Sequence, residues 1–449
     1  MTSKPKSAAV LGYLPDETPS PGKLILFAFQ QVLVMFPATV TVALLTGFHV
    51  STTIFASGLA TICFLLITKG KIPLYYGSSF SYIAAIAGVT GGVAYGELAP
   101  DALISQAQFG IICSGLVSIV AGLIVSRFGM KKIERVLPPS VTGSIALVIG
   151  ISLAGTAMKS AADFDAATGT ASTNGWIAAL ITLFATVLFS VYLKGVWGQL
   201  PILFGILVGY IACIPLGLVG PEQWKTIIDG GVVSLPHFTL PTPNLKAVLA
   251  IMPIAIATIP ESTAHLFQLD LYVNDLSKKK GKGEYKIADK LGLNLVGDGI
   301  GDIVSSAFGG PAGTNYGENI STMAITKNFS VKMLGGAAIL SILLSFFTPL
   351  SAAINTIPGV VINGACIFLF GVIAAQGIAI MVNKNVDLFN AKNLAVIAII
   401  LVVGLGGHYG FGDSGMIPIF GLELPAIATA ALAGIVLNLF LSIGEKKES

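Results

Sequence analysis

The chain has 449 residues, of which 54% are apolar and only 10% are charged. A soluble protein of this size needs far more charge to cover its surface, so the composition excludes an ordinary soluble domain and predicts a protein whose solvent is the lipid bilayer. The formal net charge of +3 is too small to indicate nucleic-acid binding.

Fourteen apolar segments follow one another along the chain, each near the length of about 20 residues that spans a bilayer. They run over 24–46, 50–68, 73–92, 104–126, 137–158, 175–193, 198–219, 246–268, 289–309, 312–326, 332–355, 358–381, 393–407 and 423–443. The third and tenth segments are short and interrupted by glycine and polar residues. We therefore predict an all-α integral membrane fold with 14 transmembrane segments, of which segments 3 and 10 are broken.

A faint internal repeat links the two broken segments. Segment three contains Tyr76-Gly77-Ser78-Ser79-Phe80-Ser81, and segment ten contains Tyr316-Gly317-Glu318-Asn319-Ile320-Ser321. Each takes third place in a set of seven, and because seven is odd, the second set enters the membrane from the opposite side. This pattern predicts a 7+7 inverted repeat, with a ligand site where the broken segments meet near the middle of the membrane.

Basic residues divide unevenly between the two sides of this topology. Only Lys159, Lys225 and Lys246 fall on one side, and the other 22 of the 25 fall on the side of the two termini. The positive-inside rule then predicts a multi-pass protein of the cell (inner or plasma) membrane with both termini in the cytoplasm.

Two acidic residues stand apart because they lie inside predicted spans. Glu261 is in segment eight and Glu318 is in the broken segment ten. A carboxylate at membrane depth is costly and usually faces a cavity or a partner, so both are candidates for function. The alternative is a buried acid held in a hydrogen bond between helices.

Several polar residues accompany these acids. His265 lies four residues after Glu261, on the same helix face, where it could share a proton with Glu261 or simply pack against a backbone carbonyl. For Asp298 and Asp302 we expect a structural role, in which each caps a helix or bonds to another helix. Gln31 could bond across helices or line a cavity. His49, His237 and His408 lie near segment ends or in loops and are given no role; no metal site is expected.

The ligand class follows from this inventory. Neither broken segment contains a buried lysine or arginine, which argues against an anion. Carboxylate acceptors and free N–H groups at the start of a half-helix match a planar solute with alternating donors and acceptors, such as a nucleobase. A desolvated glutamate takes up a proton readily and could couple transport to the proton gradient.

One stretch carries a resemblance to a known family. The run Gly313-Thr314-Asn315-Tyr316-Gly317-Glu318-Asn319-Ile320, followed by Met323-Ala324-Ile325-Thr326, resembles the signature of the nucleobase–ascorbate transporter (nucleobase:cation symporter) family, and is most similar to its uracil permease branch. The run Lys69-Gly70-Lys71-Ile72-Pro73, the spacing of Glu261 and His265, and Gly335-Gly336-Ala337-Ala338-Ile339 match as well.

The resemblance implies a core domain (24–126 and 246–355), a gate domain (137–219 and 358–443) and association as a homodimer. It also implies a set of functional residues. Glu261 and Glu318 bind the base, the backbone amides of Phe80 and Gly317 bind it too, Tyr316 and Ala38 line the pocket, and Glu261 with His265 couples the proton, supported by Gln31 and Asp298. The chain departs from the family pattern at Gln31, where a histidine is common, and at Phe370, where the uracil branch tends to have tyrosine.

Proton-coupled import of uracil is therefore the expected function, with a nucleobase and a proton as the transported partners and the lipid bilayer as the surroundings. A purine carrier for xanthine or uric acid in the same family is the main alternative, and an anion exchanger of the same fold is a second. No metal cluster, nucleophile elbow or phosphate loop is present in the sequence, so neither an enzyme nor a cofactor is expected.

Overall fold

The computed structural model describes residues 12–91, 97–129, 135–164, 169–229, 231–411, 416–419 and 422–444. Helices make up most of this part of the chain, and its strands form two short two-stranded sheets. The all-helical prediction is thus confirmed in outline.

The first half of the chain supplies two groups of helices. The earlier group consists of α1 (Pro21–Thr46), α2 (Val50–Ile67), β1 (Tyr76–Ser78), η1 (Phe80–Tyr82), α3 (Ile83–Thr90) and α4 (Asp101–Phe128). The later group consists of α6 (Pro139–Ser152), α7 (Ala154–Ala161), α8 (Thr173–Tyr192), η2 (Trp197–Gln199), α9 (Pro201–Cys213) and α10 (Pro221–Asp229). Proline occupies the first turn of α1, α6 and α9, where its missing N–H costs no hydrogen bond.

The second half of the chain also supplies an earlier group, which contains a broken segment, and a later group. Its earlier group consists of α11 (Leu245–Ile251), η3 (Met252–Ile254), α12 (Ala255–Lys279), η4 (Ala288–Lys290), α13 (Leu291–Ala307), β2 (Gly313–Asn315), α14 (Gly317–Thr326), α15 (Val331–Ser345) and α16 (Thr348–Asn355). Its later group consists of α17 (Gly359–Asn383), α18 (Ala391–Leu401), the π-helical turn η5 (Val402–Gly406), α19 (Gly407–Gly410), β3 (Met416–Ile419), β4 (Leu422–Pro425), α20 (Ala426–Leu441) and η6 (Ser442–Gly444).

Eight helical stretches in the described residues are long and apolar enough to cross a membrane. They are Pro21–Thr46, Val50–Ile67, Asp101–Phe128, Pro139–Ala161, Thr173–Tyr192, Leu245–Lys279, Gly359–Asn383 and Ala391–Gly410. The chain is therefore a multi-pass membrane protein. Each of the other six predicted segments also contains helix, in shorter pieces, and their crossing of the membrane stays a prediction.

Predicted segment 332–355 contains two helices. The structure divides it into α15 and α16. Pro349 lies in the first turn of α16, and because proline lacks an N–H and clashes with the preceding turn, a helix running through this point would be broken.

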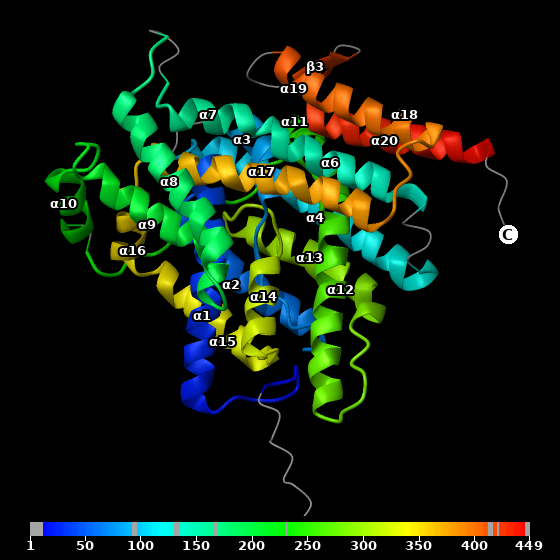
Figure 1. The fold of residues 1–449 in the computed structure, drawn as a ribbon, viewed down its shortest axis with the longest axis horizontal. Coiled ribbons are helices and arrows are strands. Elements are labelled where there is room, and N and C mark those ends of the chain that lie inside the picture. The colour runs from blue at the N-terminus through cyan, green and yellow to red at the C-terminus, as the bar shows by residue number, and fades with distance from the viewer. Residues whose placement is uncertain are drawn as a thin grey trace, which may run out of the picture.

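The helices pack mainly within two sets. In one set α13 packs against α2 and α4, and α15 against α1 and α2; in the other α17 packs against α6 and α8, α8 against α9, and α18 against α20. In Figure 1, α6, α7, α17, α18 and α20 lie across the upper part of the view, and α1, α2, α12, α14 and α15 lie below them.

The contact between α4 and α13 depends on glycine. A Cβ atom placed on Gly299 would lie 2.2 Å from the carbonyl oxygen of Gly115, and one placed on Gly115 would lie 2.5 Å from that of Gly299. The two backbones touch at this point, which is how transmembrane helices gain packing without a hydrophobic driving force. This contact holds α13, and with it the aspartates described below, against α4.

Candidate functional site

The two broken segments cross as an antiparallel pair of strands. Tyr76 faces Asn315, Gly77 faces Thr314 and Ser78 faces Gly313. Two further backbone bonds extend the pair, from Ser79 N to Ala312 O at 3.0 Å and from Tyr316 N to Tyr75 O at 3.0 Å. Segments three and ten therefore meet, as the sequence predicts.

The register corrects how the two segments correspond. Because Gly77 and Thr314 face each other at the centre of the pair, a local two-fold axis relates Ser79 to Tyr316 and Phe80 to Gly317. The alignment of Tyr76-Gly77 with Tyr316-Gly317 is thus wrong by three residues. The Tyr-Gly pair that both segments share identified the two segments that meet, but the two pairs do not occupy equivalent positions.

A half-helix begins at each of the two related residues. Phe80 is the first residue of η1, which leads into α3, and Gly317 is the first residue of α14. The first N–H groups of a helix have no partner within the helix and carry its positive end. Ser79 Oγ accepts one bond from Ser81 N at 3.3 Å, whereas Tyr316 offers no side-chain cap to α14.

Glu261 lies beside the first half-helix. Its carboxylate oxygen Oε2 accepts a hydrogen bond from Ser81 Oγ at 3.3 Å, and its side chain is partly buried. Pro260 precedes it in α12 and removes one backbone bond within the helix. By the register of the strand pair, Ser81 corresponds to Glu318. Glu318 is itself the second residue of its half-helix, and Glu261 accepts a hydrogen bond from the second residue of the other half-helix, Ser81.

His265 lies at the start of α14. A Cβ atom placed on Gly317 would come within 2.8 Å of His265 Nε2, so the imidazole ring occupies the space that any other residue at position 317 would need. Its other nitrogen, Nδ1, is buried without a hydrogen-bond partner in the part of the chain that the structure describes. The geometry brings Glu261, His265, Phe80 and Gly317 to one place.

Tyr316 and Gln31 hold α1 against the crossing. The Tyr316 hydroxyl donates to Ser78 O at 2.9 Å and bonds with Thr39 Oγ1 at 3.0 Å. Asn319 Nδ2 donates to Gln31 Oε1 at 2.7 Å and to Gln31 O at 3.0 Å. Both contacts join α1 to the second broken segment, so these residues fix the position of the half-helix that carries Glu318.

A cavity of about 190 Å³ opens next to Glu318. It lies between α1 and the helices α8, α9 and α17, and it is lined by Val34, Pro37, Ala38, Ser190, Gly198, Gln199, Leu200, Pro201, Ile202, Leu203, Glu318, Phe368, Leu369 and Val372. It is smaller than the roughly 300–1,000 Å³ of drug-sized pockets, which suits a small solute. Ala38 and Glu318 line it, whereas Glu261, Phe80, Gly317 and Tyr316 are not among its lining residues.

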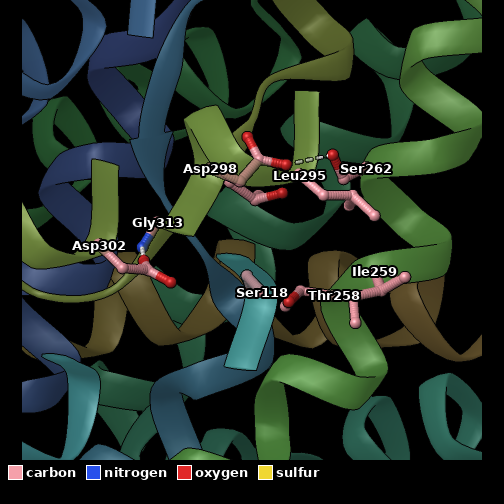
Figure 2. Close-up of a pocket in the computed structure, with 9 residues that line it drawn as sticks. Ser118, Thr258, Ile259, Ser262, Leu295, Asp298, Asp302 and Gly313 are labelled. Atoms are coloured by element: carbon pink, nitrogen blue, oxygen red, sulfur yellow. Dashed lines mark hydrogen bonds between the residues drawn. The ribbon is translucent and has the colours of Figure 1, made fainter. Parts of the chain in front are cut away.

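Behind the crossing lies a buried polar network (Figure 2). Asp302 Oδ1 accepts from Tyr76 O–H at 2.5 Å and from Gly313 N at 2.9 Å, and Asp298 Oδ2 accepts from the Ser262 hydroxyl. Asn294 Nδ2 donates to Ser262 Oγ at 2.7 Å. These bonds tie α13 and α12 to both strands, in keeping with the structural reading of the two aspartates.

A second, much smaller cavity of about 10 Å³ lies inside this network (Figure 2). Its wall includes Ser118, Thr258, Ser262, Asp298, Asp302 and Thr314. Asp298 Oδ1 and Thr314 Oγ1 are buried without hydrogen-bond partners among the described residues. The volume is at the lower limit for one water molecule, and these two atoms are suitable partners for it.

Comparison with known proteins identifies the family. Residues 22–412 match the family model described as the Permease family, which covers most of the chain. The chain belongs to the nucleobase–ascorbate transporter family. As a member of this family it is a membrane carrier and not an enzyme.

Relatives named as permeases span almost the whole chain. Uracil permease of Bacillus subtilis (strain 168) is 33% identical over 96% of this chain and 96% of its own length. Uracil permease of Bacillus caldolyticus is 36% identical over 95% of this chain and 94% of its own length. The putative pyrimidine permease RutG of Escherichia coli (strain K12) is 34% identical over 95% of this chain and 91% of its own length.

Solved structures of other transporters share the fold. SLC26A9 matches with a TM-score of 0.61 at 10% identity over 94% of this chain and 64% of its own, and the transmembrane domain of the cyanobacterial bicarbonate transporter BicA matches with a TM-score of 0.57 at 15% identity over 94% and 99%. At these identities the likeness concerns the fold alone.

Sequence reasoning did not single out several residues that contact the candidate site residues. Ser81, Thr39 and Asn319 each bond a predicted site residue. Ser81 and Asn319 lie inside the two broken segments, whereas no sequence pattern singles out Thr39 in α1. Phe370 is buried in α17 and does not line the larger cavity, although its neighbours Phe368 and Leu369 do. The departure at Phe370 therefore does not alter the wall of that cavity.

Proposed function

We propose that this chain imports a nucleobase, with uracil as the preferred substrate, in symport with protons. The observation that carries the proposal is the crossing of β1 and β2, which sets the starts of two half-helices beside two carboxylates. The relatives named uracil permease and pyrimidine permease support the choice of a pyrimidine.

The proposed binding mode pairs each edge of the base with a protein group. Glu318 and Glu261 accept hydrogen bonds from ring N–H groups, and the amides of Phe80 and Gly317 donate to ring carbonyls. Tyr316 positions the second half-helix, and Ala38 supplies apolar wall in the cavity beside Glu318. The absence of side-chain capping at the start of α14 supports its role as a donor to the ligand.

The architecture proposed around this site is a 7+7 inverted repeat of fourteen spans. The two sets of packed helices support a core domain (24–126 and 246–355) and a gate domain (137–219 and 358–443). The cavity lies where the two meet, since α1 belongs to the core and α8, α9 and α17 to the gate. Movement of one domain against the other would open this cavity to either side of the membrane in turn. The assembly we propose is a homodimer in the cell membrane, with both termini cytoplasmic.

Radiolabelled uptake into proteoliposomes tests the function. We expect uracil to accumulate when an inward proton gradient is imposed and to stop accumulating when an ionophore collapses it. Unlabelled uracil should compete at lower concentration than xanthine. Stronger competition by xanthine would make the protein a purine carrier, and exchange of sulfate or bicarbonate without uracil uptake would overturn the proposal.

The contribution of Glu318 can be measured separately. We expect Glu318→Gln to weaken uracil binding about five- to thirteenfold, because the amide keeps the shape of the carboxylate but forms a neutral hydrogen bond, which is worth about 1–1.5 kcal/mol less. Isothermal calorimetry on purified protein measures this. Glu222→Gln, an exposed acid in α10, is the matched control and should leave binding unchanged. If the two variants bind uracil with equal affinity, Glu318 does not contact the base.

A further inference from the structure

Three potential metal ligands come together from distant parts of the chain. His49 lies between α1 and α2, Asp101 is the first residue of α4, and His237 lies in the connection 231–244 that leads to α11. His237 Nε2 is 2.9 Å from Asp101 Oδ2, and His49 Nε2 is 3.9 Å from Asp101 Oδ1. One ligand atom from each of the three residues lies within 4.8 Å of the other two.

The surrounding backbone holds this cluster in place. Thr52 Oγ1 donates to the carbonyl oxygen of His237 at 2.6 Å, which fastens the connection to α2. Ala99 N donates to Gly47 O at 2.9 Å, which fastens the chain just before Asp101 to the end of α1. The rings of His49 and His237 lie against each other with centroids 4.3 Å apart and a tilt of 36° between their planes. These contacts preorganise the three side chains in the absence of a bound ion.

The spacing fits a tetrahedral transition-metal ion. Zinc binds imidazole nitrogen and carboxylate oxygen at about 2.0–2.2 Å, which places two ligand atoms of a tetrahedron about 3.4 Å apart. His237 Nε2 lies 2.9 Å from Asp101 Oδ2 and His49 Nε2 lies 3.9 Å from Asp101 Oδ1, so each imidazole approaches one oxygen of the carboxylate at a distance near that value. Two imidazoles and one carboxylate are a donor set suited to Zn²⁺, Cu²⁺ or Ni²⁺ rather than to Mg²⁺ or Ca²⁺.

Exposure and charge also favour binding. The side chains of Asp101 and His237 are 57% and 50% exposed, so an ion can enter and keep a water molecule as its fourth ligand. The Asp101 carboxylate lies beside a ring nitrogen of each imidazole, and its charge favours a cation between them.

We propose that His49, Asp101 and His237 form a binding site for one borderline divalent transition-metal ion, with Zn²⁺ as the representative ion. The ion would join three connections that the hydrogen bonds now hold more weakly: α1 to α2, the start of α4, and the segment entering α11. This site is separate from the crossing of β1 and β2, and it does not depend on which solute is carried.

Calorimetry and metal analysis on the purified full chain, with any affinity tag removed, test the proposal. We expect one Zn²⁺ per chain, binding at least tenfold more weakly in His49→Ala and Asp101→Asn and not measurably in His237→Gln. Because the ion binds the folded state only, saturating Zn²⁺ should raise the Tm of the unaltered protein and not that of His237→Gln. His408→Ala, which removes a histidine from α19, is the matched control and should keep both effects.

Two results would overturn the proposal. One is an unaltered protein that binds no Zn²⁺ at micromolar concentration. The other is a His237→Gln variant that binds Zn²⁺ as tightly as the unaltered protein, which would assign the ion to other ligands. Size-exclusion profiles of the variants in detergent verify that each is folded, and the exposure of Asp101 and His237 makes their replacement tolerable.

Discussion

Glu261 and Glu318 have different surroundings, and this difference suggests different tasks. Glu318 is exposed and faces the cavity between α1, α8, α9 and α17, where a solute would meet it first. Glu261 is partly buried, bonds Ser81 and lies outside the lining of that cavity. A carboxylate enclosed by protein at membrane depth is more costly to keep charged than one in an open cavity. Glu261 is therefore the stronger candidate to carry the coupling proton.

Replacing Glu261 by glutamine should separate exchange from gradient-driven uptake. Glutamine resembles the protonated acid and can neither take up nor release a proton. We expect Glu261→Gln to lose accumulation of uracil driven by a pH gradient and to retain exchange of labelled for unlabelled uracil, since exchange moves no net proton. Both rates can be measured side by side in the same proteoliposomes.

His265 offers a second readout for the same step. It lies four residues from Glu261 on α12 and packs against Gly317, so we expect His265→Ala to shift the pH dependence of uptake. If Glu261→Gln still concentrates uracil in a proton-dependent way, the coupling residue is not Glu261, and Glu318 takes its place.

Glu17 has a pH-dependent structural role outside the membrane. Burial raises the pKa of its carboxyl, but hydrogen bonds from Lys280, Leu14 N–H and Lys282 outweigh this and lower the pKa to about 2. The stability that these bonds contribute is present above the ordinary value of about 4.5 and is lost as the pH falls toward 2.

The contacts of Glu17 predict a difference in Tm between the unaltered protein and Glu17→Gln that disappears at low pH. We expect Glu17→Gln to lower the Tm at neutral pH, and the gap to the unaltered protein to narrow below about pH 4.5 and close near pH 2. Thermal unfolding in detergent at a series of pH values measures the gap, with Glu222→Gln as an exposed-acid control. A gap that stays constant across this range would contradict the assigned role of the Glu17 contacts.

At the level of elements, the composition of segments three and ten predicted their arrangement better than the Tyr-Gly match between them did. The short, glycine-rich and polar character of segments three and ten was enough to predict that they meet. The register was not predictable, because Tyr76-Gly77 and Tyr316-Gly317 look alike, yet Gly77 pairs with Thr314. Strand register depends on which backbone groups face each other across the chain, and a sequence match of two residues does not determine this.

The same limit applies to groups brought together by tertiary packing. His49, Asp101 and His237 come from three separate parts of the chain and share no spacing pattern, so nothing in the sequence alone groups them. The expectation of no role for His49 and His237 rested on their positions near segment ends or in loops. The split of segment 332–355 at Pro349, by contrast, was open to prediction from the chain.

The contact of α4 with α13 can be tested at the point where the two backbones touch. We expect Gly299→Ala to lower the Tm in detergent by several degrees or to prevent folding, because its methyl group would lie 2.2 Å from Gly115 O and backbone atoms cannot move aside cheaply. Gly371→Ala in α17 is the matched control, since a Cβ there meets nothing within 4 Å. That variant should be neutral or slightly more stable, by up to about 1 kcal/mol.

For the whole molecule, hydropathy located helix in all fourteen predicted segments, although only eight stretches in the described residues satisfy length and apolarity together. Four of the other six segments contain an apolar helix that is too short, at 10–17 residues: Phe80–Thr90, Pro201–Cys213, Val331–Ser345 and Ala426–Leu441. The remaining two contain α13 and α14, whose glycines and polar side chains belong to the crossing and the network behind it, so they face protein instead of lipid. Short helices and a polar site are thus two separate reasons why a predicted span fails a test of length and apolarity.

Orientation is the prediction that depends on every span at once. The 22-to-3 division of basic residues survives only if no span is missed, because one missed span would invert all later loops. Single cysteines at Lys278 and Lys225, in a background without Cys63, Cys113, Cys213 and Cys366, should therefore label from opposite sides. Both positions are exposed in the structure, so accessibility depends on the membrane side alone. We expect a membrane-impermeant maleimide to label Lys225→Cys in intact cells and to label Lys278→Cys only after the cells are opened. Labelling of both from outside, or the reverse pattern, would contradict the topology, and with it the inverted repeat that places two half-helix starts at one site.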